Sequence, residues 1–424
     1  MRLRLKTSRG RRQKSVDAIF KLWSPSQEVV MARPSYRQIS VFVGCMLSLS
    51  VIAGSAWSKD APLTPEDTST DTAIDRPSAR DLGIAPGILP AGPLNAITDV
   101  DGVLVGHVTL TDGNAINTGA TVILPHGGNL YRDRVPAGFH QGNGYGKFAG
   151  STQIIELGEL ETPIILTNTL SVPQGMEAAV SWTLNQPGNE EVRSVNAVVG
   201  ETNDGFLNDI RGRHLRAETI ETAITSAKSG SVEQGSVGAG RGTISFGWKG
   251  GIGTSSRLLP TELGGFTVGV LVQTNYGGIL RVDGKPVGRQ LGQYFMKEVI
   301  DKGDADGSII VVIATDAPLS DRNLRRLASR AMLAIGRTGS PVTNGSGDYI
   351  IAFSSHESVR RGPNKIPSNG LTNSQMSPLF QAAVEATEEA ILNALFKATS
   401  VKGHEGTIEA IDIERVKQVL ASER

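Results

Sequence analysis

Short, uninterrupted apolar runs separated by clusters of Gly, Pro and Asp occupy the chain from about residue 81 onward. Because these runs do not alternate with polar residues, they are typical of strands buried on both faces. The 50 glycines in 424 residues exceed the ordinary usage of about 7% and fit many tight turns and close backbone packing. We expect strands at residues 120–124, 163–167, 196–200, 242–248, 266–273, 309–314 and 349–353.

Three helices are indicated in the C-terminal third. Residues 321–335 repeat apolar side chains at helical spacing, with Ser320 as the N-cap. A second helix starts at Ser377 and Pro378, a cap followed by proline at the first helical position, and a third follows Asp412. Buried strands combined with outer helices predict a layered α/β domain without internal repeats.

Composition excludes several classes of function. The 42 basic and 42 acidic residues balance and aromatics are scarce, so we expect no nucleic-acid partner. None of the six histidines has the spacing of a zinc site, and no G-x-S-x-G elbow is present. The glycine clusters at 146–151 and 238–243 lack the ending of a phosphate loop. We therefore expect no metal and no cofactor.

The first 80 residues have the composition of a targeting region. An apolar run at 40–56 follows Arg33 and Arg37 and ends in small residues, which is typical of a cleavable signal peptide. An uncleaved anchor is the alternative. The layout predicts a basic prefix and signal peptide over 1–58, with the true start at Met31, then a disordered lead-in over 59–80. A periplasmic or secreted protein without stable membrane association would result, and its only cysteine, Cys45, would be removed.

Two segments place a hydroxyl at the start of a buried strand beside glycine. Residues 304–308 (DADGS) precede one apolar run, and residues 344–348 (NGSGD) precede another. Glycine lets other backbone approach closely, which an active site requires. Both segments are also ordinary turn sequences, and spacing alone favours that interpretation.

From about residue 81 to the C-terminal helices, the chain resembles the L-aminopeptidase D-amidase/D-esterase family, which includes the β-peptidyl aminopeptidases. More distant relatives are the nylon-oligomer hydrolases. The resemblance rests on ordered blocks that include TPIILTNTLSVPQG, VVGETNDGFLNDIRGRH, GWKGGIGTSSR, TVGVLVQTNYGG, DGSIIVVIATDAPLS and GRTGSPVTNGSGDYIIAF. It implies a single αββα sandwich domain over 81–424 of the N-terminal-nucleophile-hydrolase type, and homo-oligomers of αβ units.

The resemblance also implies a precursor that cuts itself between Gly307 and Ser308. An α chain of about 59–307 and a β chain of 308–424 would result, with Ser308 as the N-terminal nucleophile. Ser346 and Asp348 match the family's S/D-x-E/D pair, and Asn275 matches its oxyanion-stabilising asparagine. The family usually has tyrosine where this chain has Phe206, so a hydroxyl donor is missing there.

The implied chemistry fits these residue types. The Ser308 hydroxyl can attack the carbonyl of Gly307, and glycine tolerates the backbone strain of that attack. The released α-amine titrates near 7.7–8.0 and can serve as the base. An aminopeptidase also needs a carboxylate for the ammonium of its substrate. Glu201 and Asp204 are candidates, although carboxylates that cap a loop fit those positions equally well.

Three functions remain open. The first is an exported aminopeptidase/amidase for short peptides, amides or esters, including β- or D-amino-acid substrates. The second is a hydrolase of non-peptide amides, and the third is a non-catalytic binding protein with the same fold. A competing nucleophile is the run Thr254, Ser255 and Ser256 in GGIGTSSR, which ranks second because it opens no apolar strand.

Overall fold

The computed structural model describes residues 76–297, 307–362, 365 and 370–422. The expected signal peptide, the alternative start at Met31 and most of the lead-in lie outside these residues. Within the described ranges, no helix combines the length and apolar character needed to cross a membrane.

The described strands form two large sheets. The first has the order β1-β2-β6-β7-β4, with β1 (Leu104–Asp112), β2 (Ile116–Leu124), β6 (Ile164–Asn168), β7 (Val198–Thr202) and β4 (Phe148–Ala149). The second has the order β10-β11-β12-β13-β3-β5, with β10 (Gly251–Leu258), β11 (Thr267–Asn275), β12 (Ser308–Thr315), β13 (Gly347–Ser354), β3 (Val135–Gly144) and β5 (Glu159–Leu160). Two small hairpins join β8 (Ile244–Ser245) to β9 (Trp248–Lys249) and β14 (Val401–Lys402) to β15 (Thr407–Ile408).

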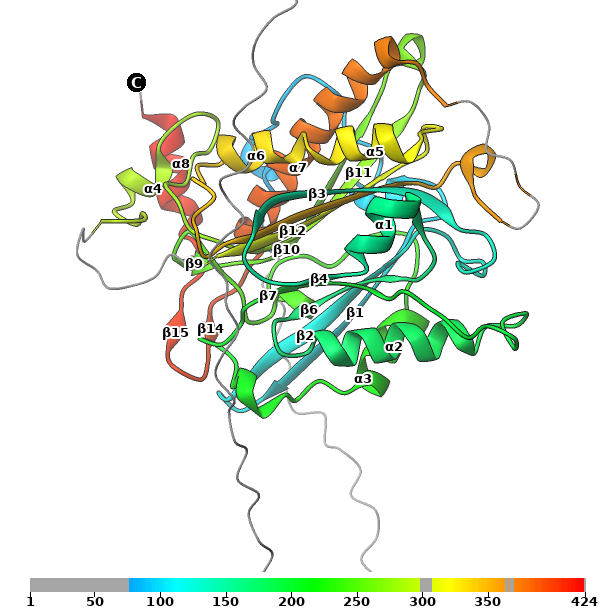
Figure 1. The fold of residues 1–424 in the computed structure, drawn as a ribbon. Coiled ribbons are helices and arrows are strands. Elements are labelled where there is room, and N and C mark those ends of the chain that lie inside the picture. The colour runs from blue at the N-terminus through cyan, green and yellow to red at the C-terminus, as the bar shows by residue number, and fades with distance from the viewer. Residues whose placement is uncertain (1–75, 298–306, 363–364, 366–369, 423–424) are drawn as a thin grey trace, which may run out of the picture. The chain divides into compact units, whose positions relative to one another are not determined.

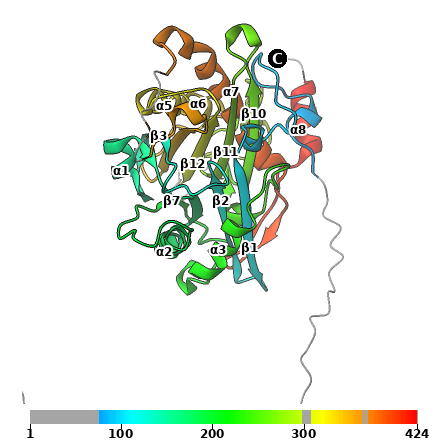
Figure 2. The same cartoon turned by 90° about the vertical axis from the view of Figure 1, so that its right-hand side faces the viewer.

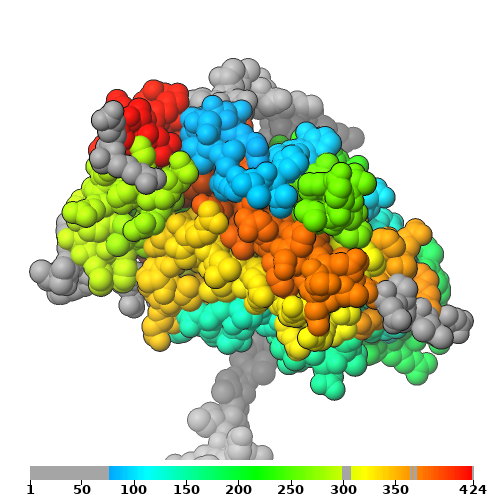
Figure 3. Space-filling model, turned by 90° about the horizontal axis from the view of Figure 1, so that it is seen from above, coloured from blue at the N-terminus to red at the C-terminus, as the bar shows by residue number. Residues whose placement is uncertain are grey.

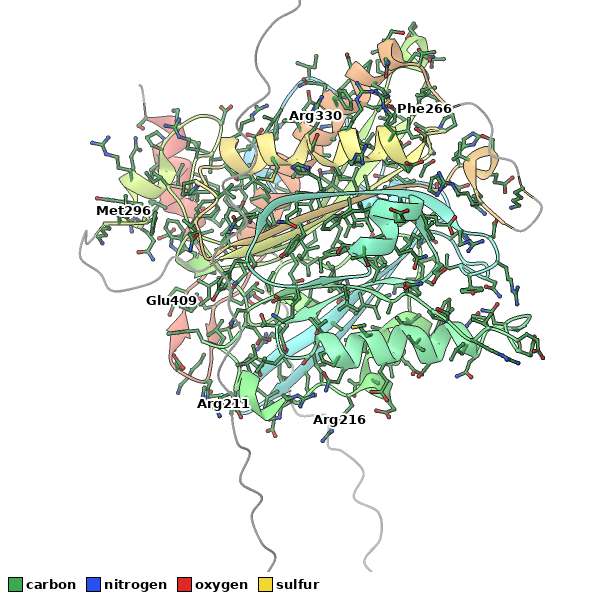
Figure 4. All side chains as sticks on the ribbon, in the orientation of Figure 1. Arg211, Arg216, Phe266, Met296, Arg330 and Glu409 are labelled. Carbon is green, nitrogen blue, oxygen red and sulfur yellow. The ribbon has the colours of Figure 1, made fainter. Side chains whose placement is uncertain are left out.

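Helices cover the outer face of each sheet, as Figures 1 and 2 show. On the first sheet lie α2 (Val172–Leu184) and α3 (Ala217–Thr225), and on the second lie α5 (Asp321–Ala328), α6 (Ala331–Arg337) and α7 (Met376–Phe396). Arg216 and Arg330, labelled in Figure 4, mark the two opposite helical layers. The remaining helices are α1 (Ser151–Leu157), α4 (Val287–Gln290) and α8 (Ile413–Ala421). The expected αββα sandwich is confirmed.

Strand β12 shows why the apolar runs are uninterrupted. Ile309, Val311 and Ile313 belong to the core between the second sheet and its helices. Their neighbours Ile310, Val312 and Ala314 belong to the core between the two sheets. Since successive side chains of a strand point to opposite faces, both faces of β12 are buried, as predicted.

The connection from β12 to β13 sets the geometry of the site. Helices α5 and α6 carry the chain back across the sheet, so that β13 runs parallel to β12 and starts at the same edge. Ser308 consequently pairs with Gly347 on one side, and with Asn275 at the end of β11 on the other. Three segments that are far apart in the sequence therefore meet where β12 begins.

Several predicted elements need correction. Residues 242–248 form no single strand, because Phe246 and Gly247 both adopt positive φ and turn the chain between β8 and β9. The predicted helix at 321–335 is two helices, interrupted at Ser329 and Arg330. Its cap is confirmed, since the Ser320 side chain accepts a hydrogen bond from the backbone N–H of Asn323. Strands β3 and β10 and helices α2 and α3 were not predicted.

The N-terminal segment (residues 76–95) packs against α7, and Figure 3 shows its blue atoms beside the orange of that helix. Arg76 donates to the carbonyls of Phe396 and Ile411, and the buried Ala79 donates its N–H to Asn393. The folded part therefore begins no later than Arg76, five residues before the expected boundary at Asp81.

A buried ion network, formed by Arg257, Glu385 and Glu389, fastens this segment. All three side chains have no solvent exposure. Arg257 contacts Glu385 at 3.2 Å and Glu389 at 2.8 Å. Glu389 also accepts from Arg80 and Asn95, and Glu385 accepts from the backbone of residues 88 and 89. Every charge in the network has a partner, which is the condition under which buried ions are tolerated.

Candidate active site

A pocket of about 140 Å³ opens where β12 starts. Its lining comes from both sheets and consists of Gly307, Ser308, Asn275, Gly345, residues 145–147, Thr169, Glu201 and Asn203. A larger hollow of about 460 Å³ lies between residues 84–87, Arg281 and Glu388, but no hydroxyl or thiol side chain lines it. The smaller pocket therefore holds the candidate nucleophile.

Asn275 offers an oriented donor to this pocket. Its side-chain oxygen accepts a hydrogen bond of 2.9 Å from the backbone N–H of Ile244, the first residue of β8. Because a backbone N–H can only donate, this contact fixes which end of the amide is oxygen. The side-chain NH₂ then remains, at a residue that lines the pocket beside Ser308. A side-chain amide NH₂ is one of the groups that can serve as an oxyanion donor.

One backbone N–H contacts both residues of the Gly307–Ser308 peptide bond. The N–H of Gly347 lies 3.1 Å from the carbonyl oxygen of Gly307 and 3.3 Å from the Ser308 hydroxyl. A Cβ at position 307 would come within 2.6 Å of the Cα of Tyr276. Close approach of the Asn275–Tyr276 backbone therefore explains the glycine at this position.

Ser346 and Asp348 form a buried pair on either side of Gly347, where β13 begins. The Ser346 hydroxyl donates to Asp348 Oδ1 at 2.7 Å, and Asp348 Oδ2 is buried without a hydrogen-bond partner among the described residues. Burial raises the pKa of Asp348 to about 6, and the bond from Ser346 opposes this only in part. The site thus contains a carboxylate with capacity for one more donor.

The pair and the nucleophile occupy opposite faces of the second sheet. Asp348 is in register with Ile309, which faces the helices, whereas Ser308 lines the pocket on the face toward the first sheet. Neither Ser346 nor Asp348 lines that pocket. The structure therefore places Ser346 and Asp348 next to the backbone of Ser308 and away from its hydroxyl.

Glu201 is the carboxylate of the pocket. It lies in β7 of the first sheet and is only 4% exposed. Oε1 accepts from the backbone N–H of Lys147 at 2.9 Å and from the Lys147 ammonium at 3.3 Å, and Oε2 accepts from the hydroxyl of Thr169. Of the two carboxylates considered for an ammonium site, Glu201 is the one that reaches the pocket.

Asp204 and Phe206 lie outside this pocket. Asp204 is 3% exposed and accepts from the side chains of Thr118 and Asn208, which makes it a loop-holding carboxylate, and burial raises its pKa to about 6. Phe206 contacts the β14–β15 hairpin through Gly406. The structure gives neither residue a place beside Ser308.

The competing nucleophiles are already engaged. Thr254, Ser255 and Ser256 lie within β10 with no solvent exposure. Their hydroxyls donate to the Val270 carbonyl, the Ala386 carbonyl and the Asp99 carboxylate, respectively. A hydroxyl that is buried and committed in this way cannot meet a substrate, so these residues hold strands and helix together.

The contributors missed at the sequence level include the N–H of Gly347 and the pocket residues Tyr145, Lys147, Thr169 and Asn203. The glycine-rich stretch 142–146 was the available signal for the loop that carries Tyr145 and Lys147, and only its continuation at 146–151 was considered, as a phosphate loop. Within the described ranges, no group of three or more His, Cys, Asp or Glu residues could hold a metal ion.

Comparison with known proteins finds one peptidase family and aminopeptidase relatives. The model of peptidase family S58 matches residues 95–409. Over 377 residues the chain is 41% identical to the beta-peptidyl aminopeptidase BapA of Sphingosinicella microcystinivorans, covering 83% of this chain and 94% of that protein. It is 37% identical over 372 residues to BapA of Sphingosinicella xenopeptidilytica, covering 82% and 92%.

Solved structures agree in fold. A Burkholderia sp. beta-aminopeptidase is 41% identical, with a TM-score of 0.72 and coverage of 81% of this chain and 98% of that chain. An L-aminopeptidase D-Ala-esterase/amidase from Ochrobactrum anthropi, described as a new variant among the Ntn hydrolase fold, is 37% identical, with a TM-score of 0.74 and the same coverage. The resemblance and the fold expected from it are confirmed, and the chain belongs to peptidase family S58, a family of hydrolases.

Proposed function

We propose that this protein is a self-processing aminopeptidase/amidase that uses Ser308 as an N-terminal nucleophile. The observation that carries the proposal is the meeting of Ser308, Asn275 and Glu201 in one pocket, beside the scissile bond at Gly307. The aminopeptidase relatives named above support the same reaction class. Nucleophile, oxyanion donor and ammonium-binding carboxylate are the parts that hydrolysis of an N-terminal residue needs.

Self-cleavage would proceed as an acyl shift. The Ser308 hydroxyl attacks the Gly307 carbonyl, and the oxygen that gains charge is the one already accepting from the N–H of Gly347 at 3.1 Å. The bond from the Gly307 carbonyl carbon to the Ser308 nitrogen breaks, and the hydroxyl proton is transferred to that nitrogen. Water then hydrolyses the ester, leaving a carboxylate on Gly307 and a free amine on Ser308.

The new amine links the two faces of the sheet. Asp348 and Ser346 lie on the face away from the Ser308 hydroxyl, so they can act on it only through the Ser308 nitrogen. An α-amine that donates to the unpartnered Oδ2 of Asp348 is held in place as the base for its own hydroxyl. Cleavage would thus complete the active site as well as expose the nucleophile.

In the cut enzyme, the substrate's ammonium would meet Glu201 while its carbonyl oxygen faces the Asn275 amide. A substrate amine placed on Glu201 orients the adjacent carbonyl toward Ser308, which favours removal of the first residue. β-Amino acids lengthen the path between ammonium and carbonyl by one carbon. We include them as substrates because both BapA relatives described above are beta-peptidyl aminopeptidases.

A denaturing gel and an activity assay test this proposal. Purified wild type should separate into two chains and hydrolyse an aminoacyl p-nitroanilide, and Edman sequencing should find a new N-terminus at Ser308. Ser308→Ala should remain one uncut, inactive chain. Ser255→Ala serves as the matched control, since it removes a hydroxyl of the competing run and should still be cut. One wild-type band, or cutting in Ser308→Ala, would refute the proposal and favour the non-catalytic binding protein.

Hydrolysis of amides without a free amine is the second candidate. It is favoured by one observation, that the Lys147 ammonium already neutralises Glu201, so a substrate lacking an ammonium leaves no unpaired charge in the pocket. Comparing the aminoacyl p-nitroanilide with its N-acetylated form distinguishes the two. Faster hydrolysis of the acetylated form would select the second candidate.

Export and assembly are part of the same proposal. The apolar run at 40–56 with its basic flank supports a cleaved signal peptide and a periplasmic or secreted enzyme. Homo-oligomers of αβ units follow from the family resemblance. Intact-mass analysis of protein purified from the periplasm, followed by native mass spectrometry, would measure signal removal and subunit number together.

A further inference from the structure

Lys147 is the only cationic side chain among the described residues that line the Ser308 pocket, and its ammonium contacts the pocket's carboxylate. Its Nζ lies 3.3 Å from Glu201 Oε1. That is where a substrate's ammonium would bind if Glu201 recognises it. A cation already present at this position must either support substrate binding or compete with it.

Exposure of the two partners differs widely. The Glu201 side chain is 4% exposed and the Lys147 side chain 52%. The carboxylate is fixed inside the protein, while the lysine reaches in from solvent on a long, flexible stem. Withdrawing the ammonium into water therefore costs little, because half of that side chain is already hydrated.

Glu201 does not depend on that ammonium for its position. The backbone N–H of Lys147 binds the same oxygen at 2.9 Å, and the Thr169 hydroxyl binds the other oxygen. Gly146 allows this approach, since a Cβ there would lie 2.8 Å from Glu201 Oε1, and its φ is +132°. Two donors thus orient the carboxylate after the lysine side chain leaves.

We propose that Lys147 is an exchangeable counter-ion that occupies the ammonium site of Glu201 in the empty enzyme and yields it to the substrate's amine. This inference rests on the proposed function and deepens it. Each binding event exchanges one ammonium for another, so the charge of Glu201 stays neutralised throughout. Lys147 thereby weakens the binding of every substrate that carries an amine, and sets the KM without touching the reacting bond.

Steady-state kinetics with an alanyl p-nitroanilide tests this inference. Lys147→Met keeps the apolar stem and removes the charge, and should lower KM about two- to fivefold, the range expected of a half-exposed ion pair. The kcat should stay within about twofold. Lys147→Arg keeps a cation and should leave KM near the wild-type value. Lys417→Met is the matched control, because it removes a lysine that pairs with Glu414 on α8, outside the pocket.

Calorimetric titration with n-butylammonium, a bare amine, gives a readout independent of turnover. Its affinity should rise by the same factor in Lys147→Met and should not change in Lys417→Met. An unchanged or higher KM, or weaker binding of the amine, would overturn the exchange and make Lys147 a positioning residue for Glu201. If the wild type hydrolyses no aminoacyl anilide, the proposed function has failed, while the titration still decides whether Lys147 competes for the site.

Discussion

Two regions of the second sheet bury carboxylates and treat them in opposite ways. Where β10 packs on α7, Glu385 and Glu389 are fully buried and every oxygen has a donor, from arginine, asparagine or backbone. Where β12 and β13 begin, Asp348 receives one hydrogen bond and keeps an unpartnered oxygen, and the Asn275 amide keeps its NH₂ for the pocket.

The difference distinguishes polar groups that stabilise the fold from polar groups that remain available to a ligand. A saturated network stabilises the fold and has no capacity left for a ligand. A site with unpartnered hydrogen-bonding groups lowers the stability of the protein before any ligand binds. Such a site is retained when those groups bind a ligand or take part in a reaction. Substitutions in the first region should therefore lower stability at constant specific activity. Substitutions in the second should lower activity, with a gain in stability where they remove the unpartnered carboxylate.

The largest expected effect comes from breaking the saturated network. In the uncut Ser308→Ala background, Glu389→Gln leaves Arg80 and Arg257 without full compensation and should lower the free energy of unfolding by about 3–5 kcal/mol. Urea denaturation measures it. Glu414→Gln, which removes an exposed carboxylate paired with Lys417, should change it by less than about 1 kcal/mol. Equal losses for both variants would show that burial does not distinguish these charges.

A comparable effect, on activity rather than stability, is expected at Asn275. Asn275→Asp keeps an oxygen for the N–H of Ile244 and removes the NH₂ donor, so kcat/KM per cut molecule should fall about 10²–10³-fold, or about 2.7–4 kcal/mol. Asn275→Ala removes both contacts, and any additional loss measures the anchoring role. If Asn275→Asp retained more than a third of wild-type kcat/KM, the amide would not be the oxyanion donor.

The smallest expected effect is a pH-dependent change in stability caused by the Asp348 carboxyl. The pKa of Asp348 is raised to about 6 in the folded chain, above its unfolded value of 3.8, so the native state binds more protons between these values. Stability therefore falls as pH rises through this window, and the cost is complete above pH 6. In the Ser308→Ala background, Asp348→Asn should raise the free energy of unfolding by about 1–3 kcal/mol at pH 8.

That gain should vanish below about pH 4, where Asp348 is protonated in both states. The exposed Asp101→Asn is the control and should show no such pH dependence. Thermal unfolding across pH 4 to 8 measures both variants. A stabilisation that persists unchanged at pH 4 would mean that the carboxyl's charge is not its cause.

Much of the framework could be predicted from sequence. The uninterrupted runs after Ser308 and Gly347 indicated strands buried on both faces, and Ser320 with its helical pattern indicated a helix between them. The structure adds that this helical segment is a crossover, so that β13 pairs with β12 in parallel and starts at the same edge. The resemblance then named the pairing of Ser308 with Ser346 and Asp348.

The faces of the site could not be predicted. Whether Asp348 shares a face with Ser308 depends on strand register, and a shift of one residue reverses the answer. Lys147 and Glu201 lie 54 positions apart and meet only because the β3–β4 loop turns toward the first sheet. Phe246 prevented a continuous strand at 242–248 by adopting a positive φ, which an aromatic residue rarely does.

The N-terminal segment and its ion network have a consequence for a cut chain. Arg80, Asn95 and Arg257 precede the Gly307–Ser308 bond, and Glu385 and Glu389 follow it. Once that bond is hydrolysed, unfolding also releases one polypeptide from another, so the equilibrium becomes bimolecular. The midpoint of denaturation should then rise with protein concentration for the cut enzyme and not for Ser308→Ala. Self-cleavage would thus make the stability of the fold depend on protein concentration, as it does for a complex of two chains.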